Sequence, residues 1–384
     1  MTEQQGPDDL RAVVKEEYVD NQATGVEVEE EGQNEVQPWD PERIRVHTKH
    51  FSLRQVVDMI QEGDIDLAPD FQRLYVWKDW QKCSLIESVL LGIPLPTFYF
   101  NEDIGGKMQV VDGLQRLTTI FDFVRKGVFT LGGLDYLSDL NGAGYAQLSP
   151  TFKRRISNTQ LVVHVIDPQT PYRVKFDIFR RINTGGSPLS AQEIRHCMSR
   201  DRSRDLLRRL SNSDSFIRAT GGSLVNHIRM ADREAVLRFC AFSILGIDGY
   251  GSSGLDAFLS RATESLDEPT NLTDQDLSAL EARFHSAMHN AHAVFGSHAF
   301  RKWPLGNERG NPINRALLEV WAVILGQYDE ELVIARAAEL ALAARKLMTE
   351  DLDFLDAISQ GTGDPARVRL RFSRVEAVAK LVLA

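Results

Sequence analysis

The stretch 110-VVDGLQRLTTIFDF-123 decides how the first half of this chain folds. Two valines end an apolar run, Asp112 and Gly113 form a turn signal, and Gln115 and Arg116 open a segment with apolar residues at helical spacing. Strand, turn and helix therefore follow one another within fourteen residues, and the polar groups collect at the turn.

The polar residues of this turn predict a site for phosphate. The N-terminus of a helix offers N–H groups without intrahelical partners and the positive end of its dipole. Gly113 permits a tight turn and a close backbone approach. Arg116 adds a guanidinium suited to phosphate oxygens, although the dipole disfavours a cation there. Asp112 could cap the helix, hold a metal ion or orient Arg116. We therefore take Asp112, Gly113, Gln115 and Arg116 as a phosphate cradle, with Asp112 and Arg116 as candidate catalytic residues.

The segments around the turn predict an α+β protein. Residues 97–100 and 107–113 are strand-like runs that predict a hairpin, and residues 160–166 predict another strand. Helical patterns precede and follow them, and beyond residue 220 the strand signals nearly vanish. We expect a small mixed α/β domain over residues 45–220 and an all-helical domain over residues 221–384.

The formal net charge of −10 is concentrated at the N-terminus. Residues 1–40 hold twelve acidic residues against Arg11 and Lys15, with few large apolar residues. Such a segment buries too little surface to offset its ordering entropy, so residues 1–44 are expected to be a disordered acidic tail. It would act as a solubilising tail or, alternatively, as a nucleic-acid mimic lying over a basic surface.

A basic block follows between residues 150 and 218, with fourteen Lys and Arg against six acidic residues. An Arg-rich block in a body whose residues 41–384 sum to zero net charge favours polyanions. The candidate DNA-binding residues are Arg200, Arg202, Arg204, Arg208 and Arg209. The alternative is a solvated helix face on which Asp201 and Asp205 pair locally with Arg204, Arg208 and Arg209.

Two further clusters have a composition similar to that of the turn. Gln72 and Arg73 lie among aromatic residues, and Arg181 and Asn183 lie where a helix gives way to a pair of glycines. The rings beside Gln72 and Arg73 could stack a base or fill the core. The second cluster has an ordinary structural explanation, because arginine and glycine suit helix C-termini.

Taken in order, four segments resemble a known family: FQRLYVW, LIESVLLGIPLP, VVDGLQRLTTI and FRRINTGGSPLSAQEIR. They are similar to the N-terminal domain of GmrSD-type modification-dependent restriction enzymes, within the ParB and sulfiredoxin-like superfamily. The resemblance covers about residues 50–200 and includes a variant of the Asp-Gly-Gln-Gln-Arg signature.

The resemblance implies a ParB-like domain that binds a nucleoside triphosphate, with Mg²⁺ as an accompanying ion, and in some members hydrolyses it. This activity would be coupled to sensing or cutting DNA in phage defence. The implied nucleotide-binding residues are Gln72, Arg73, Asp112, Gly113, Gln115 and Arg116, and more loosely Arg181 and Asn183. Leu114 stands where the signature has its first glutamine, which bears on hydrolysis more than on binding.

Other protein classes and sites fit the sequence less well. There is neither a secretory signal nor an apolar run long enough to span a membrane, and the three cysteines lie far apart, so we expect a cytosolic protein. The chain shows no HNH nuclease pattern. His285, His289 and His292 follow helical spacing, but Ser286 replaces the glutamate of a zinc-protease helix, so no metal site is expected.

Three functions are consistent with these features of the sequence. The first is a nucleotide-binding protein, with or without NTP hydrolysis, that senses or acts on DNA. The second is a non-enzymatic DNA-binding or regulatory module that uses the same pocket as a switch. The third is a DNA-nicking enzyme that uses Asp112 and a metal ion. The sequence is compatible with a homo-oligomer and with a separate nuclease partner.

Overall fold

The structure of the chain is a computed structural model, and it describes all residues except 1–13, 20–21, 30–43, 68–76 and 183–188. The chain divides into two compact units. The α/β unit comprises Pro38–Met198, and the helical unit comprises Met1–Gln37 together with Ser199–Ala384. The α+β class is confirmed. The boundary differs from the expected one at residue 220, because residues 199–220 pack in the helical unit.

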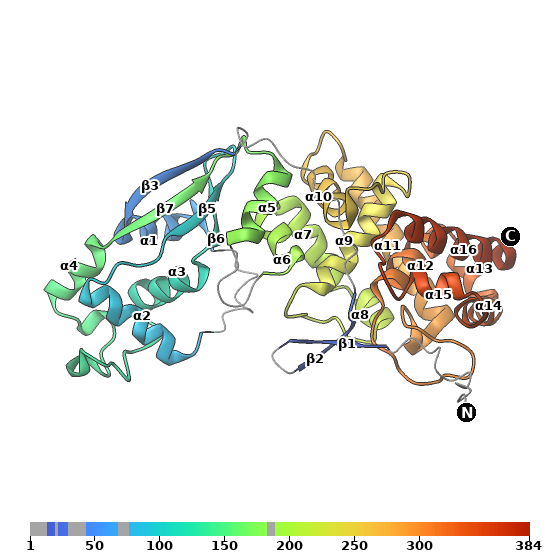
Figure 1. Cartoon of the computed structure of the whole chain (residues 1–384), viewed down its shortest axis with the longest axis horizontal. Coiled ribbons are helices and arrows are strands. Elements are labelled where there is room, and N and C mark those ends of the chain that lie inside the picture. The colour runs from blue at the N-terminus through green and yellow to red at the C-terminus, as the bar shows by residue number, and fades with distance from the viewer. Residues whose placement is uncertain (1–13, 20–21, 30–43, 68–76, 183–188) are drawn as a thin grey trace, which may run out of the picture. The chain divides into compact units, whose positions relative to one another are not determined.

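The α/β unit is built on a five-stranded mixed sheet with strand order β3-β7-β5-β6-β4 (Figure 1). The strands are β3 (Val46–Ser52), β4 (Ile65–Asp66), β5 (Phe98–Glu102), β6 (Met108–Asp112) and β7 (Gln160–Ile166). β3 pairs antiparallel with β7, and β5 pairs antiparallel with β6, which confirms the expected hairpin. β7 and β5 are parallel, as are β6 and β4.

Helices cover the sheet of the α/β unit, and Figure 1 shows α1 to α4 together on one side of it. Phe100 and Val110 of the sheet pack there with Val56 and Leu117. Asn101 and Gln109 alternate with these residues and point to the opposite face, where Lys175 contacts Asn101. The helices are α1 (Leu53–Glu62), α2 (Asp79–Leu91), α3 (Leu114–Phe121), α4 (Pro150–Asn158), α5 (Tyr172–Ile182) and α6 (Ala191–Met198).

Local capping explains where several of these helices begin and end. Ser52 accepts a hydrogen bond from the N–H of Gln55 at the start of α1, and Gly63 ends this helix at φ 86°. Ser190 and Glu193 cap each other reciprocally at the start of α6, which is the capping-box arrangement. After α3 the chain continues as a π-helical turn, Asp122–Lys126, which Gly127 ends.

A buried carboxylate ties the long loop after this turn to α2. Glu87 is 5% exposed and accepts hydrogen bonds from the N–H groups of Asp135, Tyr136 and Leu137 at 3.2, 2.8 and 2.8 Å. Burial alone would raise the pKa of Glu87, but the three N–H donors outweigh it and the pKa is lowered. The loop therefore keeps its shape through one ionised side chain.

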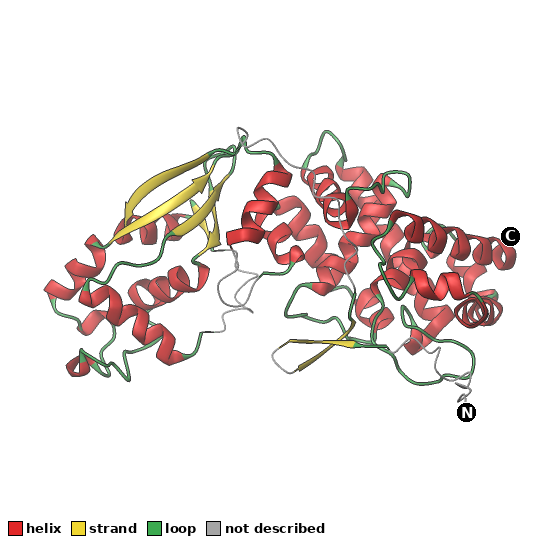
Figure 2. Ribbon diagram, viewed as in Figure 1, coloured by secondary structure: helices red, strands yellow, loops and turns green. Residues whose placement is uncertain are grey.

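Helices make up nearly all of the helical unit, as Figure 2 shows. They are α7 (Asp201–Ser211), α8 (Asp214–Thr220), α9 (Ala231–Leu245), α10 (Gly254–Asp267), α11 (Asp274–Phe295), α12 (Arg315–Leu325), α13 (Glu330–Ala335), α14 (Ala337–Glu350), α15 (Leu352–Ala357) and α16 (Pro365–Leu383). Leu206 and Phe216 join Phe239 and Phe284 in one core, which places α7 and α8 in this unit. In the described ranges, no helix is both long and apolar enough to cross a bilayer.

The N-terminal segment contradicts the expectation of a disordered tail for residues 14–19 and 22–29, which we call the strap. Its strands β1 (Glu16–Val19) and β2 (Gln22–Glu27) form an antiparallel hairpin. Val26 is fully buried and forms a parallel bridge with Ile313, with two backbone hydrogen bonds of 2.8 Å. The remaining residues of the expected tail, 1–13, 20–21 and 30–43, lie outside the described residues, apart from Ile44 at its end.

The carboxylates of the strap neutralise cations inside the helical unit. Glu27 pairs with Lys302 at 2.5 Å, and Glu17 pairs with Arg315 at 3.0 Å. Glu29 receives two hydrogen bonds from Arg238, at 3.1 and 2.5 Å. The acidic composition that suggested disorder thus serves long-range ion pairs, which offset the entropy of ordering the strap.

Candidate functional site

The predicted turn lies at the end of β6, and its glycine is required for two reasons. Gly113 has φ 98°, which side chains rarely allow. A Cβ on this residue would lie 2.2 Å from Cδ1 of Phe98 on the adjacent strand. The turn therefore brings the backbone against an aromatic ring, and α3 begins directly beyond it.

Arg116 holds the turn to the segment that precedes β5. Its Nη1 donates to the carbonyl of Pro96 at 2.5 Å, and its Nη2 donates to the carbonyl of Thr97 at 3.1 Å. Its guanidinium carbon lies 4.3 Å from the centre of the Phe98 ring, within cation–π distance. The side chain is 12% exposed, and burial lowers the pKa of Arg116, partly offset by Asp112.

Asp112 pairs with Arg116 and does not cap the helix. Its Oδ2 accepts from Nη2 of Arg116 at 3.1 Å, and no side chain caps α3. Of the three roles open for Asp112, the structure shows the one that orients Arg116. A neighbouring guanidinium also opposes a metal cation at this carboxylate, which weakens the case for nicking with a metal ion.

Pairing within the chain uses three of the five N–H groups of the Arg116 guanidinium. Its Nε–H and one Nη1–H have no partner among the described residues. The first turn of α3 adds backbone N–H groups that lack intrahelical acceptors. An anion at this turn would therefore meet donors on a guanidinium that is already fixed in place.

The other predicted nucleotide-binding residues fall into two groups. Gln72, Arg73 and Asn183 lie outside the described residues. Gln115 is half-buried in the first turn of α3, and Arg181 is exposed in the last turn of α5. The structure thus brings together Asp112, Gly113, Gln115 and Arg116, which were predicted from a single stretch.

Sequence reasoning missed a buried lysine on the opposite face of the sheet. Lys175 of α5 is 9% exposed, and its Nζ donates to Oδ1 of Asn101 at 2.9 Å. Burial lowers its pKa to about 8, against the pull of Asp167 and Asp103. Its position on the apolar side of α5, next to Val174 and Phe176, is the signal that could have revealed it.

The predicted DNA-binding arginines do not form a free basic face. Arg202 donates to the carbonyls of Leu266 and Leu272, and Arg204 is 8% exposed, so both serve packing. Arg200, Arg208 and Arg209 are about half exposed, and each pairs with a carboxylate: Glu268 at 3.6 Å, Asp205 at 2.6 Å, and Glu281. The local alternative holds for Arg204 with Asp201 and for Arg208 with Asp205, but Arg209 pairs across to α11.

The strap bears on the idea of a nucleic-acid mimic. The described carboxylates Glu17, Glu27 and Glu29 pair with cations from α9 onward. Within the described ranges, no ion pair joins the strap to the five predicted DNA-binding arginines. The cations that the strap neutralises are thus different from the five arginines that were predicted to bind DNA.

The helix α11 carries the three histidines at helical spacing. Nδ1 of His285 lies 2.8 Å from Oγ of Ser215, and His289 lies 3.8 Å from the carboxylate of Glu330. Over the part of the chain that the structure describes, no three His, Cys, Asp or Glu side chains gather as a metal site. Cys83, Cys197 and Cys240 are buried, and they form no disulfide bonds.

Comparison with known proteins relates the α/β unit to a restriction family. Residues 53–198 match the family model of the GmrSD restriction endonuclease, N-terminal domain. The match begins at α1, ends at α6 and includes the Asp112–Arg116 turn. No curated protein matches the chain. The resemblance stated from the sequence is therefore confirmed for this segment, which is similar to a restriction-enzyme domain.

Proposed function

We propose that the Asp112–Arg116 turn binds the phosphates of a nucleoside triphosphate, in a protein that senses or acts on DNA in restriction or phage defence. The family match supports the link to restriction. The observation that carries the nucleotide-binding proposal is the fixed guanidinium at the start of α3, with two N–H groups still available.

The turn is suited to phosphate because its donors are held before a ligand arrives. The two carbonyls of Pro96 and Thr97, the Phe98 ring and Asp112 fix the Arg116 side chain, so binding an anion costs little side-chain entropy. Gly113 lets the backbone N–H groups approach the ligand closely. Mg²⁺ would enter with the triphosphate, held by its phosphate oxygens.

Hydrolysis is a separate step from binding in this proposal. Leu114, in place of the glutamine of the family signature, packs against the core of the sheet. A leucine there supplies neither donor nor acceptor for an attacking water. We therefore propose binding as the main property, with the regulatory switch as the second candidate, favoured by Leu114.

Calorimetric titration of the full chain with ATP, GTP, CTP and UTP, each with Mg²⁺, tests the proposal. Arg116→Ala should weaken binding by about 1.5–3 kcal/mol, or roughly ten- to a hundredfold. Arg125→Ala is the matched control, because Arg125 follows α3 in the same helical segment but pairs with Asp58 at the surface. Its affinity should equal that of the parent.

Arg116 also holds the protein's own carbonyls, so a second variant is needed. Gln115→Ala keeps the contacts of Arg116 with the carbonyls of Pro96 and Thr97 and should also weaken binding. Phosphate release by Leu114→Gln, compared with the parent, shows whether Leu114 limits hydrolysis. If the parent binds no nucleotide, or if Gln115→Ala and Arg116→Ala both bind as well as the parent does, the cradle is wrong.

A further inference from the structure

A row of side chains crosses the sheet of the α/β unit beside the Asp112–Arg116 turn. His164 of β7 is the direct neighbour of Thr48 in β3 and of Tyr99 in β5. Tyr99 is in turn paired with Asp112 at the end of β6. Because directly paired residues place their side chains on the same face of a sheet, these four side chains form one row over four strands.

The row reaches the turn because of an irregularity in the hairpin of β5 and β6. The register shifts between Tyr99 and Phe100, so that Phe100 pairs with Val110 whereas Tyr99 pairs with Asp112. A β-bulge of this kind changes the direction of the side chains that follow it. Phe100 and Val110 stay in the core, and the carboxylate that orients Arg116 is placed next to an aromatic residue.

The two rings of the row lie against each other. The ring centroids of Tyr99 and His164 are 5.0 Å apart, and the ring planes meet at 44°. Nδ1 of His164 lies 2.9 Å from Oγ1 of Thr48, which fixes the orientation of the imidazole. Nε2 of His164 has no partner among the described residues, so it can exchange a hydrogen bond with a ligand.

The row is partly open to solvent, whereas the neighbouring part of the same face is covered. Tyr99 and His164 are half-buried, and Thr48 is exposed. Two residues further along β5, Asn101 is 6% exposed and accepts a hydrogen bond from Lys175 of α5. The cover of this face thus ends between Asn101 and Tyr99, and the turn lies on the open side.

We propose that the rings of Tyr99 and His164 form the platform on which the base of the bound nucleotide stacks. The inference rests on the proposed binding of phosphates at the Asp112–Arg116 turn, and it adds the residues that hold the other end of the nucleotide. Neighbouring strands lie roughly 4.8 Å apart, so the two rings lie about one and two strand spacings from Asp112. A nucleotide held by its phosphates at the turn can lay its base across both rings.

Ring side chains suit a nucleobase because every base has a π face, whichever base it is. The platform therefore accepts all four bases, and Nε2 of His164 adds one hydrogen bond to the base or the sugar. The ordinary alternative is a cross-strand pair of rings that only stabilises the sheet. The two roles differ in one respect: only the platform makes the affinity depend on the presence of a base.

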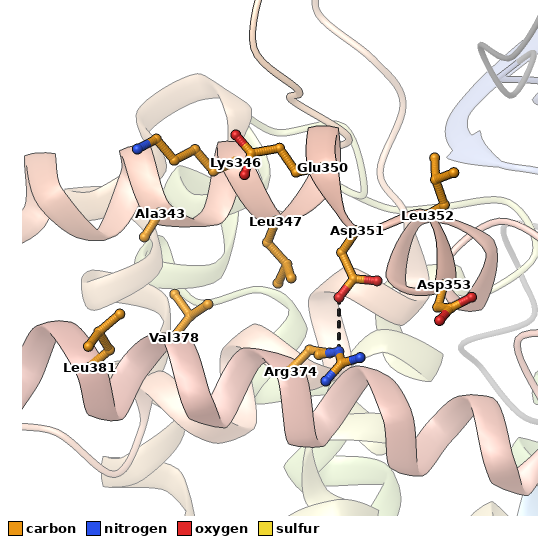
Figure 3. A pocket seen from close by; sticks show the side chains of 10 residues that line it. All are labelled: Ala343, Lys346, Leu347, Glu350, Asp351, Leu352, Asp353, Arg374, Val378 and Leu381. Carbon is orange, nitrogen blue, oxygen red and sulfur yellow. Dashed lines mark ion pairs between the residues drawn. The ribbon is translucent and has the colours of Figure 1, made fainter.

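The open groove of the helical unit does not offer a similar platform. It has a volume of about 680 Å³ and runs between α14 and α16 (Figure 3). Asp351 and Arg374 form an ion pair of 2.9 Å there. None of the ten side chains that line the groove is aromatic, so it has no ring on which a base could stack.

Inorganic triphosphate separates the two ends of the site, because it carries the phosphates without a base. Calorimetric titration of the full chain with ATP and with inorganic triphosphate, each with Mg²⁺, measures both ends. Tyr99→Ala should weaken ATP binding roughly five- to a hundredfold, which is the usual effect of losing one stacking ring, and should leave the affinity for triphosphate unchanged. Arg116→Ala should weaken the binding of both ligands.

Three further variants sharpen the comparison. Tyr99→Phe keeps the ring and should bind ATP as the parent does. His164→Ala should weaken the binding of ATP but not of triphosphate. Tyr136→Ala is the matched control, because Tyr136 is a tyrosine of the same unit that is 78% exposed and lies outside the row, so the parent affinity is expected.

Tyr99→Val, which keeps a β-branched side chain in the strand, guards against a variant that disturbs the turn. If Tyr99→Ala and Tyr99→Val both lose as much affinity for triphosphate as for ATP, Tyr99 only supports the turn and the platform is wrong. If Tyr99→Ala binds ATP as tightly as the parent does, the platform is wrong while the phosphate cradle stands. A parent that binds neither ligand contradicts the proposed function itself, and the platform with it.

Discussion

Glu29 and Arg238 lie 209 residues apart in the chain and form an ion pair that is almost entirely closed to solvent. The side chain of Arg238 is 2% exposed, and that of Glu29 is 14% exposed. Burial alone would raise the pKa of Glu29, but Arg238, Arg315 and the hydroxyl of Thr362 lower it to about 2. Burial alone would lower the pKa of Arg238, but the carboxylates of Glu29, Glu234 and Glu319 hold it well above its usual value. The strap is therefore part of the electrostatic balance of the helical unit.

Glu29→Ala should lower the free energy of unfolding by about 3 kcal/mol, because it leaves a buried guanidinium with one carboxylate fewer. The loss stays near the lower end of the usual range, since Glu234 and Glu319 still contact Arg238. Urea unfolding measures it. Glu339→Ala, which breaks the exposed pair with Arg336, is the control and should cost less than about 1 kcal/mol. Equal losses in the two variants would contradict the role of the buried pair.

The pH dependence of stability should carry the signature of Glu29. Its folded pKa of about 2 lies below the ordinary 4.5, so its contribution is complete above about pH 4.5 and is lost as pH falls toward 2. The shift corresponds to roughly 3 kcal/mol. Glu29→Gln should remove this part of the acid destabilisation, which guanidinium unfolding at pH 2.5 to 6 would show as a flatter profile. An unchanged profile would mean that the pKa of Glu29 is not lowered in the folded protein.

Deleting residues 1–29 should strongly destabilise the protein, in contrast to the behaviour of a disordered tail. The deletion removes Val26 from the core and the partners of Arg238, Arg315 and Lys302. A thermal melt of the truncated chain should show a lower melting temperature for the helical unit. Deletion of residues 1–13 alone, which keeps the strap, is the comparison. A melting temperature equal to that of the parent after the longer deletion would contradict the packing of the strap.

Glu87→Ala should cost about 3 kcal/mol or more, because three backbone N–H groups lose their acceptor. The pKa of Glu87 is lowered, so its contribution is present above its ordinary pKa and is lost as pH falls below it. Asp79→Ala in the same helix, where Asp79 pairs with Lys82 at the surface, is the control. Hydrogen exchange of residues 135–137 should increase only in the Glu87 variant.

Neutralising Arg200, Arg208 and Arg209 together should weaken DNA binding about equally for all sequences and flatten its salt dependence. These three are the accessible members of the predicted set, and each must exchange its carboxylate partner for phosphate. Neutralising Arg54, Arg336 and Arg367, which are also partly exposed and paired, is the matched control. Fluorescence anisotropy at several salt concentrations measures both sets. If the variant with Arg200, Arg208 and Arg209 neutralised binds DNA as tightly as the parent does, these arginines contact only solvent and their carboxylate partners.

The site could be predicted where its causes are local. Gly113 is required by the turn between the strand and the helix, which a single short stretch of sequence specifies, and the start of α3 follows from the same stretch. The hydrogen bonds from two of the five N–H groups of Arg116 to the carbonyls of Pro96 and Thr97 could not be predicted, because they depend on how β5 pairs with β6. The sequence thus predicts which residues gather, but not which N–H groups remain for a ligand.

The fold could be predicted except where distant segments decide it. The strand at 160–166 and the hairpin of β5 and β6 follow from alternation and turn residues. The strap was misjudged because its composition describes an isolated segment, whereas its partners lie more than 200 residues further along the chain. The two compact units divide at a different residue than expected for a related reason, since the leucines of α7 predict a helix but do not indicate which core the helix joins.

The strap also determines the order in which the two units can be completed during protein synthesis. Glu27 is made 287 residues before its partner Asn314, which at about 5–20 residues per second is a delay of roughly 15–60 s. The whole α/β unit is translated within that interval and contains all strands of its own sheet. The growing chain therefore carries an acidic hairpin without its arginines while the α/β unit is already able to fold. The helical unit closes around that hairpin only after Asn314 and Arg315 have been added.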